Sequence, residues 1–213
     1  MSIPTNTTPT SAFAPTTRTT RTTHRASCPA ASDLLVLANG TRLRFRPISS
    51  HDRDRLARLF AQLTPESRYR RFLSPKRRLT PQELMYLTDI DHVTHEAIAA
   101  IEQRDGSIVG VGRYAQFADR EAVADVAFTV ADELQGMGIG TVLARCLVDR
   151  ARANGFTLLT ATTLWENRPA RALLRRLRFR ARASHGPEIE LELELNPNAR
   201  RVADHTMRSE VIA

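Results

Sequence analysis

Three glycines at alternate positions, Gly136, Gly138 and Gly140, lie in the segment 135–141. The residues before them, 124–130, alternate and are rich in small and β-branched side chains, which is typical of a strand. After them, the apolar spacing predicts a helix that begins at about Gly140. Glycine lets backbone N–H groups approach an anion closely, and a helix N-terminus adds unpaired donors and partial positive charge. This loop is therefore predicted to bind phosphate.

Other kinds of glycine loop differ from this one in their surroundings. A P-loop closes with Lys-Ser or Lys-Thr, whereas residues 139–141 contain no lysine. A dinucleotide-binding unit has its glycines directly after its first strand, whereas several predicted strands precede this loop. A glycine-rich turn that only caps a helix stays open as an alternative.

The elements that must position the loop follow from hydrophobic periodicity and capping signals. A helix between the strands 124–130 and 156–164 predicts that these two strands pair in parallel. The chain is expected to be an α/β protein with a mixed central sheet of about six or seven strands, flanked by helices on both faces. Strands are expected at 41–48, 96–101, 106–114, 124–130, 156–164, 179–182 and 188–195, and helices at about 50–63, 64–72, 80–88, 140–155 and 167–177.

Composition suggests the extent of the domain. Residues 1–37 are rich in Thr, Ser and Pro and are expected to be a disordered tail, although the arginines in this acid-poor segment leave a transit peptide open. We expect the domain at 38–195 and a weakly structured tail at 196–213.

Composition also excludes several classes of protein. No apolar run approaches the ~20 residues of a membrane helix, so no membrane contact is expected. The two cysteines make no disulfide framework, which suits the cytoplasm, and no His or Cys pair has metal-ligand spacing, so no metal is expected. The net charge of +8 is almost all arginine and is the sole basis for a nucleic-acid-binding alternative, so no nucleic-acid partner is expected.

Three stretches together resemble the GNAT acetyltransferases, and more narrowly their bacterial protein lysine acetyltransferase (Pat) branch. They are residues 63–72 (Leu-Thr-Pro-Glu-Ser-Arg-Tyr-Arg-Arg-Phe), the loop 135–140, and residues 166–170 (Glu-Asn-Arg-Pro-Ala) with the helix that follows. The resemblance covers about 42–195. It implies the GNAT fold, acetyl-CoA as donor, and an amine that attacks the thioester directly in a ternary complex.

The resemblance also implies site residues. The backbone of Phe128, Thr129 and Val130 would follow the pantetheine, and Asn167 would lie near its sulfur end. The pyrophosphate would be bound by the loop, which comprises Gln135, Gly136, Met137, Gly138, Ile139, Gly140 and Thr141.

Two positions depart from the pattern. A tyrosine that many GNAT enzymes use to protonate the leaving thiolate is replaced by Leu174, as is common in the Pat branch. The glycine expected before Phe179 is Arg178.

Asp125 takes the place of the acid, usually glutamate, that the Pat branch carries on the strand before the loop. Attack by an amine needs a proton acceptor, because a free lysine has a pKa near 10.4. Strand alternation places Asp125 on one face with Ala127 and Thr129, where partial desolvation raises the pKa of the carboxyl group. Asp125 is thus the expected base and Glu121 the reserve, while a solvated strand-start residue is the plain alternative.

The leading hypothesis is an N-acetyltransferase that acts on an exposed lysine of a protein. A small-amine N-acetyltransferase and a non-catalytic acyl-CoA-binding module are the alternatives.

Overall fold

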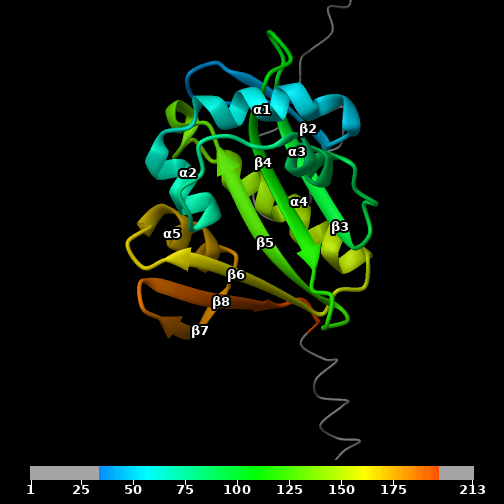
Figure 1. The fold of residues 1–213 in the computed structure, drawn as a ribbon, viewed down its shortest axis with the longest axis vertical. Helices are drawn as coiled ribbons and strands as arrows, with labels where there is room; N and C mark the ends of the chain where they lie inside the picture. The colour runs from blue at the N-terminus through cyan, green and yellow to red at the C-terminus, as the bar shows by residue number, and fades with distance from the viewer. Residues whose placement is uncertain (1–33, 197–213) are drawn as a thin grey trace, which may run out of the picture.

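The computed structural model describes residues 34–196, so most of the tails expected at 1–37 and 196–213 lies outside the described residues. Eight strands form one sheet in the order β1-β2-β3-β4-β5-β6-β8-β7 (Figure 1). Neighbours pair antiparallel except β5 and β6, which pair in parallel as predicted. The strands are β1 (Leu34–Val36), β2 (Arg42–Pro47), β3 (His95–Glu102), β4 (Ile108–Gln116), β5 (Val123–Val130), β6 (Leu158–Leu164), β7 (Arg180–His185) and β8 (Glu188–Glu194).

The seven expected strands are present, and β1 is the additional one. It pairs with β2, placing Leu35 opposite Leu43, and Leu37 after it is buried in the core. The prediction that the tail extends to residue 37 was therefore wrong for 34–37, because this short apolar segment completes the edge of the sheet.

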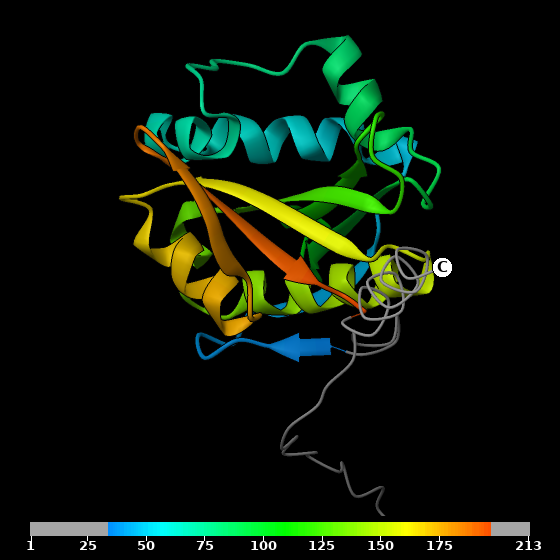
Figure 2. The ribbon, with the colours of Figure 1, turned by 90° about the horizontal axis from the view of Figure 1, so that it is seen from below.

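Helices cover both faces of the sheet, as predicted. Figure 2 shows α1, α2 and α3 on one face and α4 and α5 on the other. None of the helices within residues 34–196 is long and apolar enough to cross a membrane. The helices are α1 (Arg53–Gln62), α2 (Pro65–Phe72), α3 (Pro81–Thr88), α4 (Ile139–Ala153) and α5 (Arg168–Arg176).

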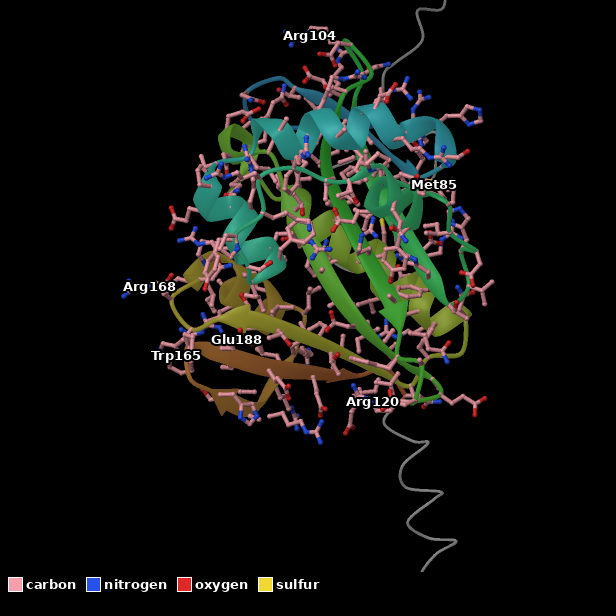
Figure 3. All side chains as sticks on the ribbon, viewed as in Figure 1. Met85, Arg104, Arg120, Trp165, Arg168 and Glu188 are labelled. Atoms are coloured by element: carbon pink, nitrogen blue, oxygen red, sulfur yellow. The ribbon has the colours of Figure 1, made fainter. Side chains whose placement is uncertain are left out.

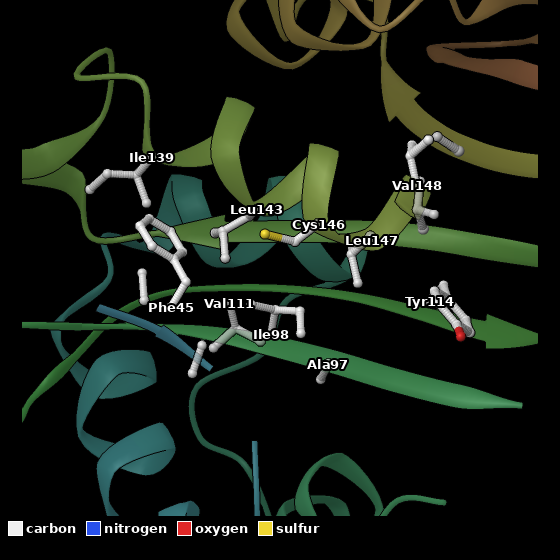
Figure 4. Packing of buried hydrophobic residues seen from close by; sticks show 14 of the residues in the cluster. Phe45, Ala97, Ile98, Val111, Tyr114, Ile139, Leu143, Cys146, Leu147 and Val148 are labelled. Carbon is white, nitrogen blue, oxygen red and sulfur yellow. The ribbon is translucent and has the colours of Figure 1, made fainter. Parts of the chain in front are cut away.

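Helix α4 forms the centre of the core. Its side chains Leu143 and Leu147 are fully buried, and they face Ile98 and Val111 of the central strands (Figure 4). Phe128 of β5 lies on this same face, where Phe128 and Leu147 would both be 3.1 Å from a Cβ atom at position 112. This close packing fixes the start of α4 relative to β5.

Helix α2 begins where its cap predicts. The hydroxyl of Thr64 accepts a hydrogen bond from the backbone N–H of Ser67, and Pro65 occupies the first turn, where its missing N–H costs nothing. The helix packs on β5 and β6, which places it over the site described next.

Candidate active site

Strands β5 and β6 diverge in the middle of the sheet. They pair only at Val123 with Leu158, Ala124 with Leu159 and Asp125 with Thr160, although both strands continue. Figure 1 shows the two arrowheads pointing away from each other, with α2 and α5 near the opening. The strand β5 therefore has backbone groups beyond Asp125 that β6 does not pair, and a ligand can pair with these groups instead.

The glycine loop lies between β5 and the N-terminus of α4. Gly136 and Gly138 have φ angles of +77° and +91°, and Gly138 is the N-cap of α4. Among the described residues, regular helical bonding starts with the N–H of Thr141, which donates to the carbonyl of Gly138. The preceding N–H groups are the unpaired donors of a helix start, so the loop can bind a phosphate group.

The third glycine serves packing. A Cβ atom at Gly140 would lie 3.3 Å from Leu173 Cδ2, so the first turn of α4 lies directly against α5. The sequence motif thus combines two glycines needed for the backbone conformation with one needed for helix contact.

The backbone groups of alternate residues of β5 point to its open side. The carbonyl of Val130 accepts a 3.1 Å hydrogen bond from Gln135 Nε2, so it points away from β4. Because strand backbone groups alternate, the N–H and C=O of Phe128 point to this same open side, while those of Thr129 point to β4. The contact of 128–130 with a pantetheine chain stays a prediction.

Asn167 caps α5. Its Oδ1 accepts a 3.2 Å hydrogen bond from the N–H of Ala170. Figure 3 shows Trp165 and Arg168 projecting from this turn between β6 and α5. The side-chain oxygen of Asn167 is therefore already bonded within the protein, and its expected place near the sulfur of a cofactor stays a prediction.

Asp125 stands at the last paired position of β5, on the face covered by α2. It is half-buried, and Thr160 Oγ1 donates a 3.1 Å hydrogen bond to its Oδ1. Burial raises the pKa of Asp125, which is the direction that the sequence predicts. The positive charges of Arg71 and Arg120 oppose this rise, and the negative charge of Glu190 adds to it. A carboxylate with a raised pKa is a stronger base, as proton abstraction requires.

Arg71 of α2 lies on the same side of the sheet as Asp125, since it lines a cavity together with Thr129, which shares that face of β5. Burial lowers its pKa, and the charge of Asp125 opposes that effect. Its guanidinium makes no hydrogen bond or ion pair with another side chain of residues 34–196. Its position therefore depends on where α2 is held.

A small cavity of about 30 Å³ lies beside Arg71, between α1, α2 and the sheet. Arg113 and Thr129 line it together with apolar side chains, and burial lowers the pKa of Arg113 to about 9. The cavity has room for about one water molecule. It is therefore too small for an acceptor side chain.

Gln135 and Asp132 connect the loop to α2. Gln135 Nε2 donates to Asp132 Oδ1 over 2.8 Å, and Asp132 Oδ2 accepts from the N–H of Thr64 over 2.7 Å. The amide nitrogen of Gln135 is thus bonded inside the protein, so its expected contact with a cofactor stays a prediction. Glu121, the reserve base, is exposed in the turn before β5.

Leu174 and Arg178 have structural roles. Leu174 is buried, so this position carries packing instead of an acid. Arg178 has a φ angle of +71°, and its N–H donates to the carbonyl of Arg175 over 3.0 Å. Phe179 donates to the carbonyl of Leu174, which completes a helix ending that normally uses glycine.

No pattern in the sequence indicated a role for Arg71, Asp132 or Thr160. Arg71 lies in the segment 63–72 that carries the family resemblance, and Thr160 lies in a predicted strand. Membership of these segments was the only sequence feature that pointed to either residue. The alternation along β5 indicates the face on which Asp125 lies. It does not indicate which side chains of other elements face Asp125. The residues 34–196 contain no group of three His, Cys, Asp or Glu side chains placed to hold a metal ion.

The fold and the site define the class of this protein. The chain matches the acetyltransferase (GNAT) domain family over residues 42–180 and belongs to that family. It is 36% identical over 145 residues to the acetyltransferase PA5475 of Pseudomonas aeruginosa, covering 67% of this chain and 77% of the relative.

Two further relatives carry the name Pat. The acetyltransferase Pat of Mycolicibacterium smegmatis is 32% identical over 132 residues, which are 62% of this chain and 39% of that protein. The crystal structure of the GNAT domain of S. lividans PAT superposes with a TM-score of 0.69 at 27% identity, covering 76% of this chain and 96% of that domain.

Proposed function

We propose that this chain transfers acetyl from acetyl-CoA to a lysine side chain of a protein, with Asp125 as the base. Support for acetyl transfer comes from membership of the family. Support for a protein lysine as the acceptor comes from the likeness to the two Pat proteins. This chain spans 39% of the Pat protein of Mycolicibacterium smegmatis.

Acetyl-CoA supplies an activated acyl group as a thioester. The residues that fit it are the loop 136–141, whose backbone leads into the N-terminus of α4, and the open edge of β5 at Phe128 and Val130. Both are built from backbone, so they can bind the ligand without a charged side chain.

Asp125 takes the proton from the amine nitrogen of the acceptor. The observation that carries this assignment is the position of its carboxylate, which stands where β5 and β6 part and is held there by Thr160. An acceptor amine that approaches through this opening meets the base at the point where the unpaired edge of β5 begins. The proposal is supported by the short distance along β5 between Asp125 and the open backbone at Phe128, which are three residues apart.

The test is to incubate the purified chain with acetyl-CoA and a cell lysate, then to map acetylated lysines by mass spectrometry. Wild type is expected to acetylate protein lysines, and Asp125→Asn is expected not to. A parallel panel of small amines tests the alternative acceptor class.

Each other outcome overturns a defined part of the proposal. Acetylation of small amines alone would replace the protein acceptor. Acetyl-CoA binding measured by calorimetry without any transfer would indicate a binding module. Absence of measurable acetyl-CoA affinity would remove the whole proposal.

A further inference from the structure

The carboxylate of Asp132 joins two parts of the site that are far apart in sequence. Asp132 lies in a short 3₁₀ turn, Asp132–Leu134, between β5 and the glycine loop. It accepts hydrogen bonds from the N–H of Thr64, from the hydroxyl of Ser67 and from Gln135 Nε2. Two of these donors belong to the N-terminus of α2, and the third belongs to the loop.

The hydrogen bonds of Asp132 connect α2 firmly to the glycine loop. A carboxylate that accepts from several donors makes charge-assisted hydrogen bonds, which are about twice as strong as neutral ones. A negative charge at a helix N-terminus is favourable as well. Burial raises the pKa of Asp132, but the bonds from Ser67 and Thr64 outweigh it, so the pKa is lowered overall. These hydrogen bonds therefore stabilise the ionised form of Asp132.

The other end of α2 carries Arg71. Helix α2 has eight residues and is about 12 Å long, so Arg71 lies about one helical turn after Ser67. Arg71 has no hydrogen bond to another described side chain, and its guanidinium lies 4.8 Å from the ring centroid of Phe72 in the same helix, so the position of its charge follows the position of α2. The structure therefore connects the loop to Asp125 through Asp132, α2 and Arg71 in turn.

We infer that Asp132 is a positioning residue that links the occupancy of the glycine loop to the placement of Arg71 over Asp125. The inference rests on the proposed function, because it needs a donor at the loop and Asp125 as the base. Acetyl-CoA bound at the loop then stabilises α2, and α2 in its anchored position keeps Asp125 ionised.

The first test is the pH dependence of kcat/KM. The groups that face Asp125 are Arg71 from α2, Arg120 from the turn before β5, Thr160 from β6 and Glu190 from β8. Arg71→Gln is expected to move the ascending limb to higher pH by about one unit, the size that a nearby opposite charge produces.

Asp132→Ala is expected to move the limb in the same direction, and the double variant is expected to match Arg71→Gln alone. Shifts that add in full, or a limb that stays in place in Asp132→Ala, would overturn the inference. A loss of folding stability alone does not move this limb, so the measurement separates positioning from support.

Two variants serve as controls. Glu133→Ala removes the same charge from the same turn, at an exposed residue, and is expected to keep the wild-type limb. Asp132→Asn keeps an oxygen acceptor for α2 and is expected to recover most of the wild-type kcat/KM, whereas Asp132→Ala is expected to lose about tenfold. An Asn variant as impaired as the Ala variant contradicts the role assigned to the acceptor oxygens.

The second test is hydrogen exchange of the α2 amides with and without saturating acetyl-CoA. Wild type is expected to exchange several-fold more slowly with acetyl-CoA bound, and Asp132→Ala is expected to show no such change at a saturating concentration. Equal slowing in both proteins overturns the link. A wild type that binds no acetyl-CoA by calorimetry overturns the proposed function itself, so the two failures are distinguishable.

Discussion

Thr160 donates a 3.1 Å hydrogen bond to Asp125 across the last position at which β5 and β6 pair. The bond therefore connects the two strands at the point where they diverge. It also orients the carboxylate that the acceptor amine would meet. The hydroxyl group favours the ionised form of Asp125 and so opposes the effect of burial.

Removing this hydroxyl group is expected to change the pH dependence of transfer. Thr160→Val takes away a hydrogen bond to the charged form, so the pKa of Asp125 rises further and the ascending limb of kcat/KM moves to higher pH. Thr162→Val is the matched control, because Thr162 lies on the same face of β6, pairs with Glu190 of β8 and stands beyond the last pair between β5 and β6. The role of Thr160 would be refuted by a limb that stays in place, or by equal shifts in both variants.

Neutralising the base is expected to stop chemistry while preserving binding of the donor. Asp125→Asn should lower kcat by at least about 100-fold, the usual contribution of a general base, with acetyl-CoA affinity within about twofold of wild type. Thiol release and calorimetry measure the two quantities. Asp119→Asn, at an exposed acid in the turn before β5, should leave both unchanged. Retained turnover in Asp125→Asn would exclude Asp125 from the mechanism.

Alanine substitutions in the glycine loop are expected to have different effects, because Gly138 is needed for its backbone conformation and Gly140 for helix packing. Gly138→Ala forces a side chain into a left-handed conformation and should lower the free energy of unfolding by about 1–2 kcal/mol, with weaker acetyl-CoA binding. Gly140→Ala meets only the flexible end of Leu173 at 3.3 Å and should cost less stability. Urea unfolding and calorimetry check both, and a larger stability loss at Gly140 contradicts this division.

The end of α5 offers a stabilising substitution. Arg178 holds a left-handed backbone that favours glycine, so Arg178→Gly should raise the free energy of unfolding by about 0.5–1 kcal/mol. Arg176→Gly, two residues earlier within the helix, should instead destabilise by about 1 kcal/mol. Thermal unfolding of the two variants tests this prediction, since the unfolding temperature is expected to rise in the first and to fall in the second.

A buried carboxylate should make stability depend on acid pH. Burial opposes ionisation of Asp52, but hydrogen bonds from Arg46 and Ser49 outweigh it and lower its pKa to about 2 from 3.8. Its contribution is therefore complete above pH 3.8 and is lost as pH falls toward 2. Asp52→Asn should cost about 3 kcal/mol at pH 6 and flatten this dependence. Exposed Asp54→Asn is the control for urea unfolding at pH 6 and pH 3.

Much of the fold could be predicted because local signals agree with the tertiary structure. Thr64-Pro65 and Thr80-Pro81 start helices where their capping signals predict. The alternation of 188–195 predicts a strand with one buried face, and β8 is such a strand. The exception was β1, since three residues next to a polar segment carry too little periodicity to indicate a strand. Its formation depends on pairing with β2, which is a contact made across a turn.

Several backbone features could be predicted from the sequence alone: a glycine loop at a helix start, a parallel pair of strands around that helix, and a carboxylate on the small-residue face of β5. Each follows from residue type and period along a single segment. Only the tertiary structure decided which groups surround Asp125, since Arg71, Thr160 and Glu190 come from three other elements. It also decided that Asp132 and Gln135 tie the loop to α2, because hydrogen bonds between segments some 68 residues apart leave no trace in local pattern.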